Sequence, residues 1–324
     1  MPTSIPSFAK INLGLKIGPT RADGFHELRT IYQTIALHDV IKVEVQRGTG
    51  IEIRCKDPRV PTDESNTCYR VAERVMRALR GRGKVTVWIE KRLPVQGGLG
   101  AASSNAVATI FALERELGAA LSSEERLRIA AEVGSDLPLF LVGGAVLGVD
   151  RGQEVYPLQD LRPMHLVVLT PAVGVSTPQA FANWDALVAR EAELTHAGAA
   201  GTIKQFGSAV YAWLSKGFLS TGVPAMGGDR AETQLLDLVR AGIENDFERV
   251  VFPEHPELRE AKRVLEREGA RYASLSGSGS TLYGIFASAE DASGAAERIN
   301  AAGYTAVATK TLGREAYWRE LGLA

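Results

Sequence analysis

The chain has 324 residues, 45% of them hydrophobic, and a formal charge of −1 at pH 7. This length suffices for two domains with their own cores, and the near-neutral charge excludes a broad basic surface for nucleic acid or anionic lipid. Cys55 and Cys68 are too few for a disulfide framework or a zinc site, and residues 1–10 lack the apolar run of a signal peptide. We therefore expect a cytoplasmic protein that binds neither nucleic acid nor a membrane.

The first predicted element is a strand at residues 8–17 with two polar side chains on one face. Apolar residues alternate with Lys10 and Asn12 along it. Because residues two apart in a strand are separated by about 7 Å, these two side chains can reach into one pocket. The simpler alternative is an exposed lysine on an edge strand. The segment that follows argues against that alternative and favours the shared pocket.

A tight turn at residues 18–24 leads to Phe25 and His26, at the start of a second predicted strand that ends near Leu37. The turn contains Gly18-Pro19 and an Asp-Gly pair. An aromatic ring beside an imidazole can stack on a flat heterocycle and hydrogen-bond to it. The alternative is a core phenylalanine beside a surface histidine, which is the commoner arrangement for such a pair taken alone.

The next elements lead into a glycine-rich loop. Residues 40–46 and 51–54 are predicted as a strand pair around a turn at 48–50. A helix is expected from residue 66 or 67 to 79, and alternating apolar residues predict a strand at 84–90.

The loop itself combines a strand end, three glycines and a helix start. Gly97, Gly98 and Gly100 allow backbone N–H groups to approach an anion, and the helix start adds unpaired donors and a positive dipole. We therefore predict a phosphate site. The loop does not fit the Walker pattern, because Ala101-Ala102 stand where Lys and Ser or Thr are required. It does not fit the dinucleotide pattern either, because Ser103 replaces a glycine.

A carboxylate follows two further predicted helices. The first helix includes residues 106–113, and the second begins at the capping box of Ser122 and ends at Gly134. Asp136 comes directly afterwards, before an apolar run that contains Pro138. A carboxylate at this place is either a turn former or a functional group.

The C-terminal half is predicted to be a second α+β layer that begins near residue 156. Strands at 271–275 and 281–286 flank a second glycine loop at 276–280, and a helix at 289–301 and a strand at 304–311 follow. Residues 191–232 are the least predictable part: a short helix is expected at 203–214, and we assign the stretch no role. Residues 244–248 and 252–258 are interpreted as structural.

Several of these segments together resemble the GHMP kinases. The loop follows their pattern of Pro, Gly-Leu-Gly and a Ser pair, and Asp136 and the loop at 276–280 match two further motifs. The resemblance covers most of the chain except residues 191–232. It implies an α+β, two-domain GHMP kinase fold, with a ribosomal-S5-like ATP-binding domain at 1–155 and a ferredoxin-like domain at 156–324.

The same resemblance implies roles for single residues. Asp136 would be the catalytic base and Lys10 the catalytic cation. The cofactors would be ATP and Mg²⁺; the metal ligands stay unassigned, because Ala102 stands where relatives such as mevalonate kinase have a serine. The expected ATP-binding residues are Pro94, Gly97, Gly98, Leu99, Gly100, Ala101, Ala102, Ser103, Ser104 and Asn105.

The N-terminal segments resemble one branch of the family more closely. Its patterns are Ala-Lys-Ile-Asn-Leu, here 9–13, and Arg-x-Asp-Gly-Phe-His, here 21–26. That branch phosphorylates the 2-hydroxyl of a cytidine diphosphate-linked methylerythritol, in non-mevalonate isoprenoid synthesis. Two alternatives stay open: another small-molecule GHMP kinase, and a non-catalytic ligand-binding protein on the same fold. The residues expected to bind substrate are Asn12, Phe25, His26, Thr177, Gly277, Ser278 and Gly279.

Overall fold

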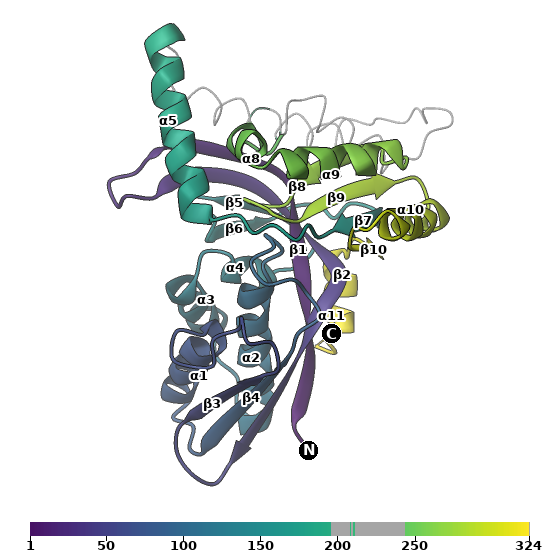
Figure 1. The fold of residues 1–324 in the computed structure, drawn as a ribbon. Coiled ribbons are helices and arrows are strands. Elements are labelled where there is room, and N and C mark those ends of the chain that lie inside the picture. Colours follow the sequence, from purple (N-terminus) through teal and green to yellow (C-terminus); the bar gives the residue numbers. More distant parts are fainter. Residues whose placement is uncertain (196–207, 209, 211–243, 324) are drawn as a thin grey trace, which may run out of the picture.

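The computed structural model describes residues 1–195, 208, 210 and 244–323, whose strands form two sheets (Figure 1). The first sheet has the order β3-β4-β2-β5-β6, with β1 paired to β2, and the second has the order β10-β7-β9-β8. The strands are β1 (Thr3–Thr20), β2 (His26–Gln46), β3 (Ile51–Cys55), β4 (Lys84–Glu90), β5 (Ala145–Val149), β6 (Glu154–Pro157), β7 (His165–Leu169), β8 (Tyr272–Leu275), β9 (Leu282–Phe286) and β10 (Ala306–Lys310).

A long antiparallel ribbon of β1 and β2 runs through both halves of the molecule (Figure 1). Its register extends from Thr3 opposite Val43 to Thr20 opposite His26, so the two strands expected at 25–37 and 40–46 are one strand. Nearly all of β1 is buried. Its first part packs in the N-terminal core and its last part, including Leu15 and Ile17, packs in the C-terminal core. The ribbon therefore links the two cores.

The expected strand pair at 40–46 and 51–54 is wrong. Strand β3 pairs in parallel with β4, and β4 lies between β3 and β2. A parallel pair needs a long crossover, which helix α1 (Thr67–Ala78) provides. Local turn chemistry at 48–50 suggested a hairpin, but β4 lies between the two strands, and the buried face of α1 packs in the N-terminal core with residues of β3 and β4.

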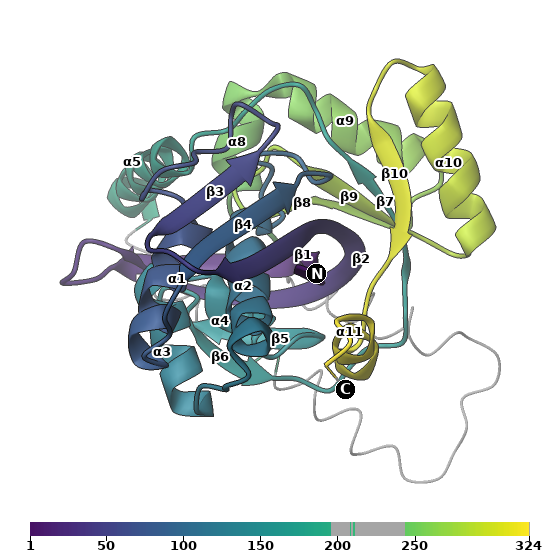
Figure 2. The same cartoon turned by 90° about the horizontal axis from the view of Figure 1, so that it is seen from below.

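Helices pack against each sheet and bring the loops into place (Figure 2). Asn66 caps α1 and Ser122 caps α3, as the sequence predicted. On the first core lie α2 (Ala101–Leu117), α3 (Ser123–Val133) and the single turn α4 (Leu137–Phe140). The second half contributes α5 (Thr177–Thr195), α8 (Glu248–Glu254), α9 (Pro256–Arg267) and α10 (Ala289–Ala301). Within the described residues, no helix is long and apolar enough to cross a bilayer.

The last helix, α11 (Arg314–Glu320), returns to the first core and lies apart from α10 (Figures 1 and 2). The hydroxyl of Tyr317 donates to the carbonyl of Phe140 at 2.7 Å, and the indole of Trp318 donates to the carbonyl of Val142 at 3.0 Å. By packing, this helix belongs with the N-terminal half, which departs from the expected division at residue 155. The helix expected at 203–214 falls almost wholly outside the described residues.

A fully buried carboxylate, Asp39 on β2, holds the chain that enters the glycine loop. It accepts hydrogen bonds from the backbone N–H groups of Arg92 and Leu93 at 2.7 and 2.8 Å, and from the amide of Asn105 at 3.0 Å. The two backbone groups bond to Oδ1, whereas the Asn105 amide bonds to Oδ2, and the ammonium of Lys91 lies 2.5 Å from Oδ2 as well. Asp39 therefore ties together β2, the loop entry and the first turns of α2.

We predict that Asp39→Ala destabilises the protein by about 3–5 kcal/mol, because it leaves a partly buried ammonium and several N–H donors without an acceptor. The measurement is urea unfolding followed by circular dichroism. The matched control is Glu90→Ala, which removes an exposed carboxylate paired to Arg92 and should leave the unfolding midpoint nearly unchanged. Equal midpoints for the two variants would refute the structural role of Asp39.

Candidate active site

The first glycine loop, between β4 and α2, is clamped between β1 and the second glycine loop. The backbone N–H of Lys10 donates to the carbonyl of Leu99 at 3.0 Å, and the hydroxyl of Ser276 donates to the carbonyl of Gly98 at 3.0 Å. Gly98 has φ +73°, and a Cβ there would lie 2.1 Å from the Ser276 carbonyl oxygen. Only glycine fits this close approach. No described side chain caps the start of α2, so its first N–H groups are available to an anion.

Two cavities meet at this loop. One has a volume of about 350 Å³ and lies against the start of α1; the other, about 670 Å³, lies toward α5 and the second glycine loop. Gly98 and Gly100 line both. A phosphate chain held on the loop would therefore face the smaller cavity on one side and the larger cleft on the other.

The predicted ATP-binding residues line the smaller cavity, with one exception. Ser104 is buried behind the loop, where its hydroxyl lies 2.8 Å from that of Ser7. Asn105 lines the cavity, but its side chain accepts a hydrogen bond from Ser7 and donates one to Asp39. Both residues therefore support the loop from inside, and the expectation that Ser104 contacts ATP is not met by its position.

Lys10 and Asp136 come together in the larger cleft from distant parts of the sequence. The ammonium of Lys10 lies 3.6 Å from Oδ2 of Asp136 and donates to Oδ1 of Asn12 at 2.7 Å. Lys10 is 3% exposed, whereas the Asp136 side chain is 34% exposed. Burial lowers the pKa of Lys10, and the neighbouring carboxylate partly offsets that effect. The site thus pairs a buried cation, which has little contact with water, with a carboxylate that a substrate can reach.

Tyr32 also belongs to this cluster, and sequence reasoning missed it. Its hydroxyl donates to Oδ1 of Asp136 at 3.1 Å, and the Lys10 ammonium lies 5.5 Å from the centre of its ring. Burial raises the pKa of Tyr32 well above its usual value, so the phenol stays a protonated donor. In the sequence Tyr32 is one aromatic residue in an alternating strand, which does not distinguish it from a core residue.

Phe25 stands at the far end of the cleft with 54% of its surface exposed. The turn before it is closed by Asp23, whose carboxylate accepts from the Phe25 N–H at 3.2 Å. The guanidinium of Arg151 lies 5.0 Å from the ring centre. This large exposed ring in a cleft favours the ligand-binding interpretation of Phe25 over the core interpretation.

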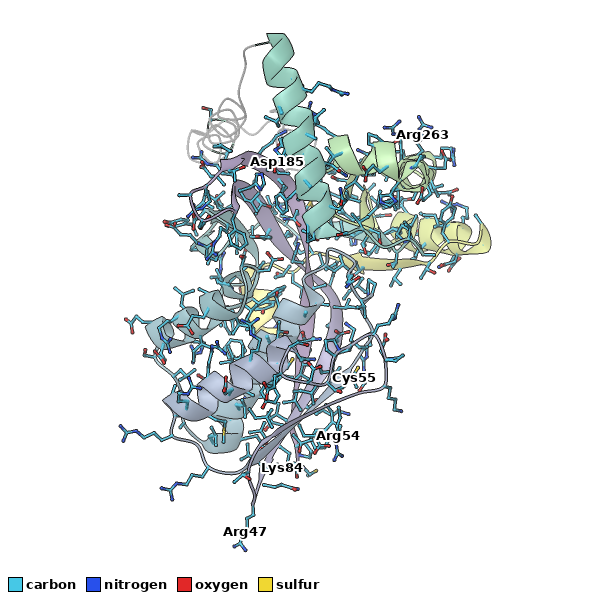
Figure 3. All side chains as sticks on the ribbon, turned by 60° about the vertical axis from the view of Figure 1, so that its left-hand side comes forward. Arg47, Arg54, Cys55, Lys84, Asp185 and Arg263 are labelled. Carbon is cyan, nitrogen blue, oxygen red and sulfur yellow. The ribbon has the colours of Figure 1, made fainter. Side chains whose placement is uncertain are left out.

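His26 is buried beside it and held by α5. Its ring is stacked on Phe181, with centroids 4.8 Å apart, and Nε2 lies 2.7 Å from Oδ1 of Asp185. Figure 3 shows Asp185 on the part of α5 that lies beside the β1–β2 ribbon. Sequence reasoning missed Phe181 and Asp185. Their spacing was a usable signal, because residues 177, 181 and 185 fall on one face of a helix.

The second glycine loop closes the same cleft. Asn245 donates from its amide to the carbonyls of Leu275 and Gly277, both at 2.8 Å, which fixes the loop. Ser278 lies 2.7 Å from the Thr177 hydroxyl at the start of α5. Thr177, Gly277 and Ser278 line the cleft with Asn12 as expected, whereas Gly279 does not: it faces the side chain of Leu275.

Comparisons with known proteins agree with this geometry. Residues 66–144 match the N-terminal domain of the GHMP kinases, and residues 231–305 match their C-terminal domain. The 4-diphosphocytidyl-2-C-methyl-D-erythritol kinase of Solibacter usitatus is 38% identical over 280 residues, covering 86% of this chain and 80% of that protein. That of Prosthecochloris aestuarii is 32% identical over 299 residues, covering 92% and 94%.

Solved structures give the same result. A crystal structure of 4-(cytidine 5'-diphospho)-2C-methyl-D-erythritol kinase superposes with a TM-score of 0.72 at 28% identity, covering 96% of this chain and all of that one. Homoserine kinase from Cytophaga hutchinsonii superposes with a TM-score of 0.65 at 18% identity, which shows the shared fold alone. The two curated relatives, at 38% and 32% identity over most of both chains, together with the two family matches establish that the protein is a GHMP kinase and belongs to the 4-diphosphocytidyl-2-C-methyl-D-erythritol kinases.

Proposed function

We propose that this protein transfers the γ-phosphoryl group of ATP to the 2-hydroxyl of 4-diphosphocytidyl-2-C-methyl-D-erythritol, giving the 2-phosphate and ADP. The observation that carries the proposal is the Lys10–Asp136 pair in the cleft beside the glycine loop. In the smaller cavity, ATP would lie with its phosphates on the backbone of residues 97–103. The acceptor would lie in the larger cleft, with its hydroxyl against Asp136.

The chemistry follows from this arrangement. Asp136 accepts the hydroxyl proton as the substrate oxygen bonds to the γ-phosphorus, and the bond to the β,γ-bridging oxygen breaks. Lys10 neutralises charge that develops on the transferred group, and burial strengthens this interaction because little water screens it. Asn12 keeps the ammonium in place. The residues thus provide positioning and charge stabilisation, which phosphoryl transfer chiefly requires.

Mg²⁺, the cation that accompanies ATP, is also part of the proposal. Among the described residues, no three His, Cys, Asp or Glu side chains gather as a metal site. Mg²⁺ in kinase sites is commonly held by ATP phosphates and water together with one or two protein oxygens. Ser103, which lines the smaller cavity at the start of α2, is the candidate oxygen. When bound, the cation would neutralise phosphate charge.

The far end of the cleft favours the cytidylyl substrate over those of other GHMP kinases. The exposed ring of Phe25 offers a face for cytosine. His26 already uses Nε2 for Asp185, so a hydrogen bond from its ring to the base would come from Nδ1. The non-catalytic alternative is disfavoured because both Lys10 and Asp136 are present and adjacent. A cytoplasmic location without nucleic-acid or membrane partners remains part of the proposal.

We predict that the wild-type protein releases ADP with the cytidylyl substrate but not with homoserine or mevalonate. Asp136→Asn should lower kcat about a hundredfold or more while both substrates still bind, because it removes the base and leaves the loop intact. A coupled ADP-release assay measures this. Activity with a different alcohol would overturn the substrate assignment, and near-normal turnover of Asp136→Asn would overturn the role of the base.

Gly98→Ala should raise the KM for ATP about tenfold or more, because its new Cβ forces the loop away from the Ser276 carbonyl. Gly118→Ala is the matched control. Gly118 has a similar φ, +60°, but a Cβ there meets nothing within 4 Å. Both substitutions place alanine at a positive φ, which costs about 1–2 kcal/mol. The two variants therefore differ only in the clash between the new Cβ of residue 98 and the second glycine loop. Equal KM values for ATP would show that the close approach is dispensable.

Phe25→Ala should raise the KM for the cytidylyl substrate roughly 10- to 100-fold and leave that for ATP almost unchanged, since a stacked base contributes about 1–3 kcal/mol. Phe25→Tyr keeps the ring and should be close to neutral. Tyr156→Ala, which removes an exposed aromatic residue outside the cleft, is the control. Unchanged substrate affinity in a folded Phe25→Ala protein would remove the support for cytosine recognition at this ring.

A further inference from the structure

The position of Tyr32 is tightly constrained by its neighbours. It lies on β2 opposite Val146 of β5 and is 3% exposed. A Cβ on Gly148 would lie 2.5 Å from Cε2 of its ring, and a Cβ on Gly152 would lie 2.5 Å from its hydroxyl oxygen. Two glycines therefore make room for the ring and for its hydroxyl group; the side chain packs in the N-terminal core and also lines the active-site cleft, where its hydroxyl meets Asp136.

Asp136 is otherwise weakly held. It precedes the single turn α4, and within the described chain its side chain makes no capping hydrogen bond. The carboxylate is one-third exposed, and its ammonium partner lies at the long distance of 3.6 Å. The Tyr32 hydroxyl at 3.1 Å is the shorter contact, and it engages Oδ1, whereas Lys10 faces Oδ2. The two oxygens thus have different neighbours.

We propose that Tyr32 is a positioning residue for phosphoryl transfer: its hydroxyl holds Oδ1 of Asp136, so that Oδ2, beside Lys10, takes the proton of the acceptor hydroxyl. The inference rests on the proposed role of Asp136 as base. The ring of Tyr32 also packs against the Lys10 ammonium, which lies 5.5 Å from the ring centre. One side chain therefore contacts both members of the catalytic pair.

The test is Tyr32→Phe, which removes one oxygen atom and keeps the ring next to the Lys10 ammonium. We expect kcat to fall about tenfold and KM for both substrates to change less than about twofold. The matched control is Tyr317→Phe. It removes a buried tyrosine hydroxyl that donates to the carbonyl of Phe140 at 2.7 Å, so it should cost stability without moving kcat.

A double-mutant cycle separates positioning from a general loss of structure. In the Asp136→Asn background, Tyr32→Phe should have little further effect on kcat, because the group it positions is gone. A tenfold loss in that background as well, or a Tyr32→Phe enzyme with wild-type kcat, would overturn the inference and leave the proposed function standing. A wild-type protein without turnover of the cytidylyl substrate would overturn the proposed function, and this inference with it.

Discussion

The buried ammonium of Lys10 is the constraint on which the rest of the site depends. A charge at 3% exposure is stable only with close polar partners, and Asn12, Asp136 and the ring of Tyr32 provide them. Each partner comes from a different place: β1, the turn before α4, and β2. The same residue's backbone N–H fixes the first glycine loop through Leu99. Placing the charge therefore also places the base and the phosphate loop relative to each other.

The β1–β2 ribbon makes this placement possible. It contributes to both cores, carries Lys10 and Asn12 in its middle, and ends in the turn that presents Phe25. The two ends of the proposed substrate are the hydroxyl that accepts the phosphoryl group and the cytosine ring. Both would thus contact one continuous ribbon. The two glycine loops meet across it, with the Ser276 carbonyl against Gly98, so the nucleotide side depends on the C-terminal half as well. Neither half carries a complete site.

Many local features were predictable because short-range forces decide them. Asn66 and Ser122 cap helices as their side-chain oxygens suggest, and the alternation at residues 84–90 gives a strand with Val85, Val87 and Ile89 buried. The strand pair expected at 40–46 and 51–54 failed because a turn signal does not determine which strand is inserted between two others. Pairing of β4 with both β2 and β3, which are distant from it in sequence, settles that point. Ser104 and Gly279 share motifs with cavity-lining neighbours but face away from the cavities, which a motif does not reveal.

By itself, the sequence indicated the phosphate loop, because that loop depends on residue types at short spacings. Through its resemblance to the GHMP kinases it also predicted the family and the candidate residues Lys10 and Asp136, because each lies in a motif that can be recognised alone. Only the tertiary structure showed that Tyr32 contacts both members of that pair, that Asp185 holds His26, and that α11 returns to the first core. These contacts join residues separated by as many as 177 positions. Their formation depends on the packing of whole elements, and no local pattern of hydrophobicity, charge or turn chemistry encodes it.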